Sequence, residues 1–392
     1  MPEQLFVVGG EVEPPYFIGR KAEIEKMKLD ILTQAQNNVL IGPRRIGKTS
    51  LLKNLKAAVE DDVLFVAVNC REMTGKSDFF RVITRALLET YEEKHHIKGL
   101  AEKYSRVFRG KITAAYRSLS ELGGSIEHIG NVYLRFREED FKESELVVET
   151  FAFVKNFSDE KKEPIVIALD EFQELQRFNG QIFNMLKSHM DSQPTIRYIF
   201  SGSSISLLHE VFLKPDSPMY LMTARVQLEA IKEADVSEYI RERLKTQNIE
   251  LTDPALKKIY SYTGGFPFYF QKIGFTLYQA SVLKNKNIID EEDVEYAFNS
   301  MLNEFDGEFE ARYEGKFSDQ QKNILKFLSR EKYRRLSEIS HDMQTPASSL
   351  TASMKDLYNT MTIEKPEEGK YGILDNAFRI WIRRNILKAS GE

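Results

Sequence analysis

The sequence has 392 residues and a formal net charge of −4 at pH 7. A chain of this length is too long for one ordinary hydrophobic core, so we expect two or three domains. The composition, with 42% hydrophobic and 29% charged residues, is that of a globular protein and excludes collagen-like, disulfide-rich and disordered classes. The longest apolar runs, such as Val63–Val68 and Ile165–Leu169, are far shorter than the about 20 residues of a membrane-spanning helix.

Cysteine and histidine usage excludes two kinds of site. The single cysteine, Cys70, cannot form an intrachain disulfide or a cysteine metal cage, and the six histidines show no ligand spacing. Residues 1–10 carry the acidic Glu3 and no basic stretch ahead of their apolar residues, which is unlike a secretory signal. These features predict a cytoplasmic protein without a membrane span.

The first predicted elements are a strand, a loop and a helix. Asn38–Ile41 is a short apolar strand, Gly42–Gly47 is a turn-rich loop, and Lys48–Val59 has leucines at helical spacing. A second strand is predicted at Val63–Asn69. A glycine-rich loop between a strand and a helix is a setting in which proteins bind phosphate groups.

The loop carries the most specific motif of the chain. Residues 42–49 read Gly-Pro-Arg-Arg-Ile-Gly-Lys-Thr and match G-x-x-x-x-G-K-[ST], whose main-chain NH groups surround nucleotide phosphates. Lys48 is expected to bridge the β- and γ-phosphates, and the Thr49 hydroxyl to ligate Mg²⁺. An ordinary glycine turn before a helix is the alternative. The predicted nucleotide-binding residues of this segment are Gly42, Pro43, Arg44, Arg45, Ile46, Gly47, Lys48, Thr49 and Ser50.

The next segment interrupts the sheet pattern. From Phe79 to about Lys155 the sequence is mostly helical in pattern and highly charged, and it lacks apolar strands, so we predict a helical insertion. Strand character returns at Pro164–Asp170 and Ile196–Ser201, which are apolar on both faces as in buried parallel strands. A helix around residues 182–190 separates these two strands, and a fifth strand is predicted at Val226–Ile231.

Polar groups follow the third and fourth predicted strands. Asp170 and Glu171 end an apolar strand and resemble a Walker B motif, in which Asp170 would hold the Mg²⁺ shell and Glu171 would orient and polarise the attacking water. A structural pair of acids is the alternative. Ser203, with Ser201 as second choice, is predicted to lie beside the γ-phosphate, although these serines could equally cap the following helix.

The second half of the chain is helical. Helices are predicted at Ala234–Thr246, Asp253–Thr263, Pro267–Lys284 and Asp290–Asn303, which together suggest a lid. The Glu- and Gly-rich segment Glu304–Gly315 is the predicted boundary to the last domain.

The last domain is predicted to hold three helices and a hairpin, an order typical of a winged helix-turn-helix. The helices are Asp319–Leu328, Leu336–Asp342 and one from Pro346 to Tyr358, with Thr345 as its N-cap and Pro346 in its first turn. The hairpin is Met361–Leu374. Residues 318–392 hold 13 Lys and Arg against 10 Asp and Glu, so this end is basic.

Two surfaces of this domain are candidates for contact with DNA. The third helix is predicted to expose Ser348, Ser349, Thr351, Ser353 and Lys355. The candidate phosphate contacts are Arg330, Lys332, Arg334 and Arg335, together with Arg383 and Arg384. A plain solvated face, or a protein contact, is the alternative for both.

Several of these features together resemble the archaeal ATPase family, a group of signal-transduction (STAND) ATPases close to AAA-type and origin-recognition ATPases. They are Tyr16–Glu23 before the loop, the Asp170-Glu171 pair, the Ser-Gly-Ser-Ser turn at 201–204, Arg225 before a strand, and Gly264–Pro267. The resemblance covers about Tyr16–Lys284, and Tyr371–Trp381 is similar to the winged-helix domain that such proteins often carry.

The resemblance implies roles for three residues. Arg20 and Pro267 would flank the nucleotide base, and Arg225 would contact the γ-phosphate in the same subunit or in a neighbouring one. A surface role for Arg20 and a solvated or salt-bridged role for Arg225 remain alternatives. The long segment between the second and third strands departs from the family pattern, so no function is carried over to it.

We therefore predict an α/β P-loop NTPase core with a parallel sheet at residues 1–232, a helical insertion at about 79–155, a helical lid at 233–303 and a winged helix at 316–392. The predicted function is a Mg²⁺-dependent ATPase switch that couples ATP binding to a DNA or protein partner, as a monomer or a homo-oligomer. The alternative is a DNA-binding replication or mobile-element maintenance protein in which ATP is mainly structural. A phosphotransferase lacks a visible acceptor site.

Overall fold

The computed structural model describes residues 4–34, 36–99, 143–178, 181–192, 195–203, 205–217 and 219–387. The chain forms two compact units. The sheet unit comprises Arg20–Ile41 and Lys48–Gln227, and the helical unit comprises Met1–Gly19, Gly42–Gly47 and Leu228–Glu392. Residues 42–47 of the predicted phosphate loop therefore group with the second half of the chain, whereas Lys48, Thr49 and Ser50 belong to the sheet unit.

The sheet unit is built on five parallel strands in the order β2-β3-β4-β1-β5. The strands are β1 (Asn37–Ile41), β2 (Leu64–Asn69), β3 (Ile165–Asp170), β4 (Ile196–Gly202) and β5 (Thr223–Gln227). Every residue of β3 is buried, which explains why its sequence is apolar on both faces. The predicted α/β class with a parallel sheet is confirmed.

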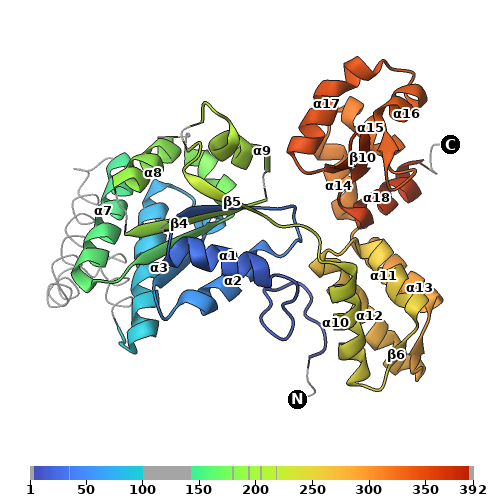
Figure 1. The fold of residues 1–392 in the computed structure, drawn as a ribbon, viewed down its shortest axis with the longest axis horizontal. Helices are drawn as coiled ribbons and strands as arrows, with labels where there is room; N and C mark the ends of the chain where they lie inside the picture. The colour runs from blue at the N-terminus through green and yellow to red at the C-terminus, as the bar shows by residue number, and fades with distance from the viewer. Residues whose placement is uncertain are drawn as a thin grey trace. The chain divides into compact units, whose positions relative to one another are not determined.

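Helices connect these strands. They are α1 (Lys21–Leu32), α2 (Lys48–Val59), α3 (Lys76–His95), α7 (Glu143–Lys161), α8 (Gln181–Ser192) and α9 (Ile205–Leu208), with the short segments η1 (Cys70–Glu72), η2 (Phe172–Phe178) and η3 (His209–Leu213). Helix α1 packs beside α2, and α3 packs beside α7 (Figure 1). The predicted helical insertion begins in α3 and ends in α7, while residues 100–142 lie outside the described residues.

The fifth strand differs from its prediction. It spans Thr223–Gln227 rather than Val226–Ile231, so Arg225 lies inside the strand and not before it. Strand β5 ends at Gln227 because its partner strand β1 ends at Ile41, the residue opposite Gln227. Leu228 and Ile231 are nevertheless buried, so their apolar character reflects packing and not strand pairing.

The first part of the helical unit contains five helices and a short parallel strand pair. They are α10 (Glu233–Lys245), α11 (Asp253–Thr263), α12 (Pro267–Lys284), α13 (Glu291–Glu304) and α14 (Asp306–Lys316), with β6 (Glu250–Leu251) paired to β7 (Ile288–Ile289). The four helices predicted between residues 234 and 303 are confirmed.

Helix α14 occupies the segment in which we predicted a domain boundary. The segment is rich in Glu and Gly, but it also contains Phe309 and Tyr313, which are four residues apart and buried on one face of the helix. The Phe309 ring lies 5.5 Å from that of Phe378 and 6.0 Å from that of Trp381, measured between ring centroids. The segment is therefore a packed helix, and composition alone did not reveal it.

The C-terminal module, residues 318–387, combines helices with a three-stranded antiparallel sheet. Its elements are α15 (Asp319–Leu328), β8 (Arg334–Arg335), α16 (Leu336–Asp342), α17 (Ala347–Asn359), β9 (Ile363–Glu367), β10 (Lys370–Ile373), α18 (Asn376–Ile382) and η4 (Arg383–Leu387). The sheet order is β8-β10-β9, and β9 pairs antiparallel with β10, so the predicted hairpin is present. The division of the chain into domains at 232, 303 and 316 stays a prediction.

The start of helix α17 corrects one detail. Thr345 is not its N-cap, because Pro346 takes that position with an extended ψ of 136°. The Thr345 hydroxyl instead donates to the Met343 carbonyl at 2.9 Å. A residue before proline is pushed out of the helical region, which places Thr345 in the preceding turn.

The predicted basic cluster of the C-terminal module is largely engaged within the protein. Arg330 and Arg334 both bind Asp342, with N–O distances of 2.9 and 2.8 Å. Arg334 also donates to the Phe327 carbonyl, and Arg384 donates to Asn299 at 2.7 Å. These arginines hold the module together, so they are weaker candidates for phosphate contacts than their sequence suggests.

Asp342 should stabilise the module in a pH-dependent manner. Burial opposes its charge, but the hydrogen bonds and charges of Arg334 and Arg330 outweigh burial and lower the pKa of the carboxyl. The stabilisation is therefore present above the unfolded pKa of about 3.9 and is lost as the pH falls through the lower folded value. We expect Asp342→Asn to reduce the free energy of unfolding at pH 7 by about 1 kcal/mol, between the values of exposed and buried ion pairs.

Urea unfolding of both proteins between pH 7 and pH 3 measures this difference. Asp356→Asn, in the same module, is the control, since Asp356 accepts a hydrogen bond from the neutral Gln321. A difference between wild type and Asp342→Asn that stays constant down to pH 3 would contradict the assignment.

No helix in the part of the chain that the structure describes is both long and apolar enough to cross a membrane.

Candidate nucleotide-binding site

The carboxyl ends of three strands meet at one edge of the sheet unit. Strand β1 ends at Ile41, which pairs with Gly202 at the end of β4, and β3 ends at Asp170 beside β4. In open parallel sheets, ligands bind at the carboxyl edge of the strands. This edge therefore collects residues that are far apart in the sequence.

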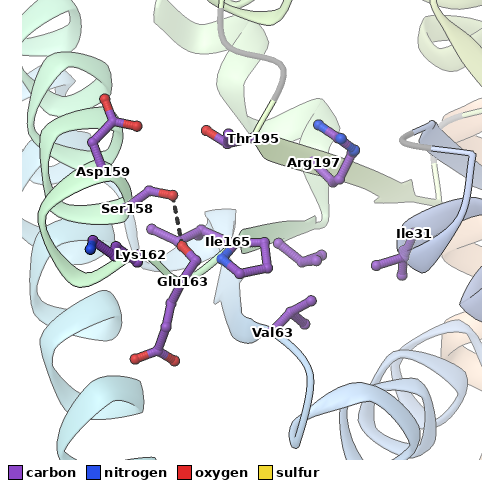
Figure 2. A pocket seen from close by; sticks show the side chains of 11 residues that line it. Ile31, Val63, Ser158, Asp159, Lys162, Glu163, Ile165, Thr195 and Arg197 are labelled. Atoms are coloured by element: carbon purple, nitrogen blue, oxygen red, sulfur yellow. Dashed lines mark hydrogen bonds between the residues drawn. The ribbon is translucent and has the colours of Figure 1, made fainter.

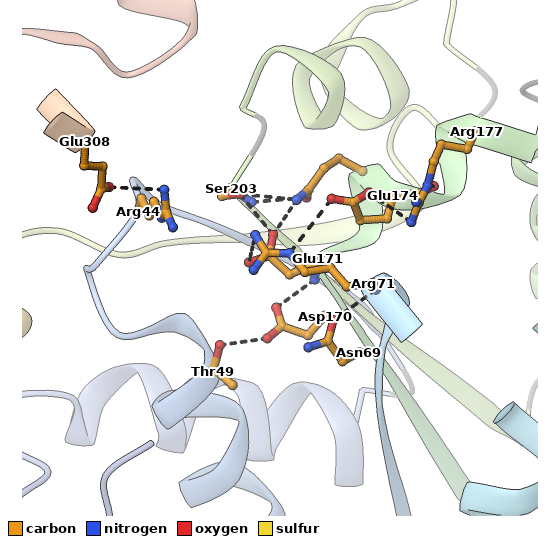
Figure 3. Close-up of polar contacts among 11 residues, drawn as sticks. Arg44, Thr49, Asn69, Arg71, Asp170, Glu171, Glu174, Arg177, Ser203 and Glu308 are labelled. Atoms are coloured by element: carbon orange, nitrogen blue, oxygen red, sulfur yellow. Dashed lines mark hydrogen bonds and ion pairs between the residues drawn. The ribbon is translucent and has the colours of Figure 1, made fainter. Parts of the chain in front are cut away.

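A contact between Thr49 and Asp170 joins the start of α2 to the end of β3. The Thr49 hydroxyl donates to a carboxylate oxygen of Asp170 at 2.7 Å, although 121 residues separate the two (Figure 3). Asp170 and Lys48, the residue before Thr49, are each only 8% exposed. The structure thus brings together residues that the sequence assigned to one site.

These two oxygen-bearing residues suit Mg²⁺. Mg²⁺ prefers hard oxygen ligands and usually takes one or two from the protein, the rest coming from phosphates and water. Among the described residues, no group of three or more His, Cys, Asp or Glu could hold a metal by itself. A hydroxyl and a carboxylate oxygen 2.7 Å apart fit an ion that is shared with a nucleotide.

Glu171 is held by three neighbours in an unusual backbone conformation. Its φ is +52°, a left-handed value that costs a residue with a side chain about 1–3 kcal/mol and persists only where the surroundings demand it. Its carboxylate pairs with Arg71 at 3.1 Å and accepts from the Ser203 hydroxyl at 3.0 Å. The Gln173 amide donates to the same carboxylate.

Sequence reasoning missed Arg71 and Gln173. Arg71 lies in η1, which follows β2 directly. Gln173 lies in η2, which begins at Phe172, the residue after Glu171. Gln173 also accepts a hydrogen bond from the Ser203 main-chain NH at 3.2 Å, which ties the ends of β3 and β4 together. The position of Arg71 just after β2 could have indicated that it lies near Glu171, because the carboxyl end of β2 lies beside that of β3.

Cys70 lies in the same region but is chemically quiet. The thiol is buried, and burial together with the nearby Asp170 raises its pKa, so it stays protonated near neutral pH.

In the helical unit, both glycines of the loop are required by its geometry. A Cβ added to Gly42 would lie 2.8 Å from the Ile46 side chain, closer than real Cβ contacts, and a tight 3.2 Å from Leu228. Gly47 has a φ of +95°, and a Cβ there would lie 3.8 Å from the Pro267 ring. The structure therefore places Pro267, expected near the nucleotide base, beside the loop.

The loop arginines differ in their surroundings. Arg44 is 69% exposed and pairs with Glu308 at 3.3 Å (Figure 3), whereas Arg45 is 11% exposed and pairs with the same carboxylate at 2.5 Å. We predicted both as nucleotide ligands, but both guanidinium groups bind Glu308 of α14. Their main-chain NH groups remain the candidates for phosphate contact.

The other predicted residues are more dispersed. Arg20, just before α1, is buried and pairs with Glu23 at 3.1 Å. The buried Ser50 lies in α2, one residue after Thr49. Arg225 lies on β5, its guanidinium donating to Gln227 and its carbonyl accepting from Lys26 at 3.0 Å. The structure does not bring the Arg225 side chain together with Asp170 or Glu171.

A cavity of about 420 Å³ in the sheet unit lies at the opposite edge of the sheet (Figure 2). Its lining includes Glu163 and Thr195, which precede β3 and β4, and Arg197 near the start of β4. The Ser158 hydroxyl donates there to the Glu163 carbonyl at 2.7 Å. Because this is the amino end of the strands, the cavity is separate from the Thr49–Asp170 contact.

The sequence matches the model of a protein family. The family is described as an ATPase domain predominantly from Archaea, and the match covers residues 17–273, more than half of the chain. The chain belongs to this ATPase family. The archaeal ATPase resemblance noted in the sequence is therefore confirmed.

Several solved structures are similar to this ATPase. A Walker-type ATPase of Pyrococcus abyssi shares 17% identity, with a TM-score of 0.69 over 97% of this chain and 100% of that chain. The Cdc6 protein of Pyrobaculum aerophilum and the ORC2 protein of Aeropyrum pernix each share 13% identity over 97% of both chains, with TM-scores of 0.47 and 0.48. None of the curated proteins matches the sequence.

Proposed function

We propose that this ATPase binds ATP with Mg²⁺ through residues 42–50 and hydrolyses it at the carboxyl edge of the sheet. The observation that carries the proposal is the 2.7 Å contact between Thr49 and Asp170, which joins the two oxygen ligands expected for the metal. Membership of an ATPase family supports ATP as the substrate. The absence of an Asn-Lys-x-Asp guanine motif in a suitable place favours adenine over guanine.

Each residue of the site has a proposed task. Lys48 binds the β- and γ-phosphates, and the main-chain NH groups of the loop hold the remaining phosphate oxygens. Mg²⁺, held by Thr49 and Asp170, would neutralise charge on the phosphates. Glu171 orients and polarises the attacking water once its carboxylate turns from its present partners, and Ser203 positions Glu171 and faces the γ-phosphate.

Three further residues complete the proposal. Arg20 and Pro267 flank the nucleotide base. Arg225 supplies positive charge to the γ-phosphate, and because its side chain lies along β5, a neighbouring subunit of a homo-oligomer is the arrangement that suits it best.

We further propose that nucleotide state controls a DNA or protein partner through the C-terminal module, acting as a winged helix. Four residues of α17, Ser348, Ser349, Thr351 and Lys355, are exposed and could reach bases or phosphates. Ser353 does not belong to this face, because its hydroxyl donates to Gln320 of α15 at 2.5 Å. The engagement of Arg330 and Arg334 by Asp342 leaves the exposed Lys332, Arg335 and Lys355 as candidate phosphate contacts.

Two measurements test the proposal. Calorimetry with ATP and MgCl₂ should detect stoichiometric binding, and its absence would end the proposal. The ATPase rate with and without duplex DNA, at two salt concentrations, separates the partners, because phosphate contacts weaken steeply with salt. Salt-sensitive stimulation by DNA favours a DNA partner. DNA affinity that ignores both salt and nucleotide counts against a DNA-regulated switch, and also against a DNA-binding protein with structural ATP.

We expect the Arg71–Glu171 ion pair to slow ATP hydrolysis. Arg71 stabilises the Glu171 carboxylate in a position where Ser203 and Gln173 also bind it. We expect Arg71→Ala to raise the turnover number severalfold, because a partly exposed ion pair, worth about 0.2–1 kcal/mol, no longer restrains the carboxylate. Steady-state ATPase assays measure this.

The control is Arg177→Ala. Arg177 pairs with Glu174 at 3.1 Å and leaves the contacts of Glu171 intact, so its turnover should match wild type. Lower turnover in Arg71→Ala would show instead that Arg71 assists catalysis.

A further inference from the structure

Arg45 of the phosphate loop is held by side chains from the second half of the chain. Its guanidinium lies over the rings of Phe268 and Phe305, 4.7 and 4.5 Å from their centroids. It donates to the Tyr269 hydroxyl at 3.0 Å and pairs with Glu308 at 2.5 Å. Burial opposes its charge, but Tyr269, Glu308 and Asp375 outweigh burial and raise the pKa of the guanidinium, so Arg45 stays charged.

The hydrogen bonds continue from Tyr269 into the C-terminal module. The fully buried Tyr269 hydroxyl accepts from Arg45 and donates to Asp375 at 3.0 Å. The other carboxylate oxygen of Asp375 accepts from the Phe378 main-chain NH at 3.1 Å and so caps helix α18. Arg312 of α14 binds Asp375 at 2.8 Å. An unbroken chain of polar contacts thus runs from the phosphate loop to the first turn of α18.

The backbone of Arg45 links this chain to the shape of the loop. Its φ is +70°, a left-handed conformation that residues with side chains rarely adopt. Such a conformation persists when the surroundings over-determine it, and here the aromatic rings and Glu308 do so. Any turn of the loop peptides around bound phosphate must move the Arg45 Cβ and therefore its guanidinium.

We infer that Arg45 couples nucleotide occupancy of the phosphate loop to the packing of helix α18, through Tyr269 and Asp375. The inference rests on the proposed binding of ATP at residues 42–50. Chains of hydrogen bonds in a low-dielectric interior polarise one another, so a change at one end is felt at the other. Coupling is reciprocal, so a change at α18 also alters nucleotide affinity, typically about 5–150-fold in systems of this kind.

The chain offers a built-in reporter of this coupling. Trp381 is the single tryptophan of the sequence and lies in α18, where it is 3% exposed. Its ring stacks on Phe378 with centroids 6.0 Å apart, and its indole NH donates to Asp306 at 2.6 Å. Intrinsic fluorescence therefore reports on the first turns of α18 without a label.

The test titrates the full-length protein with ATP or ADP in MgCl₂, following Trp381 emission, while calorimetry measures binding on the same samples. In wild type, nucleotide should change the emission. Tyr269→Phe removes the central hydroxyl, so it should bind nucleotide but lose most of the emission change. Tyr239→Phe is the matched control: its hydroxyl donates to the Gln271 side chain at 3.0 Å, outside the Arg45–Tyr269–Asp375 chain, and its response should equal wild type.

Each outcome decides a separate point. Nucleotide binding with unchanged Trp381 emission and unchanged hydrogen exchange of the α18 amides in wild type would overturn the coupling and leave ATP binding in place. A full response in Tyr269→Phe would also overturn it. No nucleotide binding to wild type would remove the proposed function and the coupling together. Should Tyr269→Phe fail to fold, the half-exposed Glu308→Gln tests the hold on Arg45 directly, with a weakened response expected and a wild-type response overturning the coupling.

Discussion

Glu171→Gln should keep ATP binding and lower the turnover number at least about 100-fold, because general-base catalysis contributes roughly 10²- to 10⁴-fold. Glutamine retains the shape of the side chain but cannot accept a proton from water. Its amide oxygen can still accept from Arg71, which now binds one carboxylate oxygen of Glu171 at 3.1 Å. Its amide NH₂ can donate to the Ser203 hydroxyl, which now donates to the other carboxylate oxygen at 3.0 Å. The site should therefore remain folded and able to bind nucleotide.

The measurement pairs calorimetry of ATP binding with single-turnover hydrolysis. Glu174→Gln is the matched control, since it makes the same chemical change three residues away, in an acid that pairs with Arg177 at 3.1 Å. The control should hydrolyse ATP at nearly the wild-type rate. Unchanged hydrolysis in Glu171→Gln would remove Glu171 from its assigned role.

Lys48→Ala should weaken ATP binding by roughly 10- to 150-fold, the equivalent of about 1.5–3 kcal/mol for hydrogen bonds to a charged group. Lys48 is the first residue of α2 and is only 8% exposed, directly beside the Thr49 that contacts Asp170. Its ammonium group is the one cation that the P-loop motif assigns to the β- and γ-phosphates.

Calorimetry with ATP and MgCl₂ measures the change, and thermal unfolding without nucleotide shows whether the variant is folded. Lys53→Ala, on the exposed face of the same helix, is the control and should bind ATP as wild type does. A Lys48→Ala protein that is folded and binds ATP with unchanged affinity would show that the loop does not bind phosphate in the proposed way.

The site was predictable in part. The G-x-x-x-x-G-K-T motif and the apolar strand ending in two acids are local patterns, and parallel strands bring such ends to one edge. The contact of Thr49 with Asp170 confirms that the two patterns meet. Arg71 and Gln173 were not predictable in the same way, because their importance lies in their distance from Glu171 and not in any motif.

Tertiary partners decided three further features that local patterns did not. Strand β5 ends at Gln227 because β1 ends opposite it. Helix α14 (Asp306–Lys316) buries Phe309 and Tyr313 against the rings of Phe378 and Trp381 of α18. The sequence suggested that Arg330 and Arg334 contact nucleic acid, but both guanidinium groups bind the Asp342 carboxylate. The roles of the site residues and the division into domains stay predictions.

By itself, the sequence determined the parallel α/β core, the phosphate loop and the pair of acids, because each depends on residue types repeated at short spacing along the chain. Only the tertiary structure decided where the side chain of Arg45 goes, since its partners come from residues more than 200 positions later. Short-range patterns record backbone propensity and burial. They carry no information on which distant side chains pair with a buried charge such as Arg45. In this protein those partners connect the phosphate loop to helix α18.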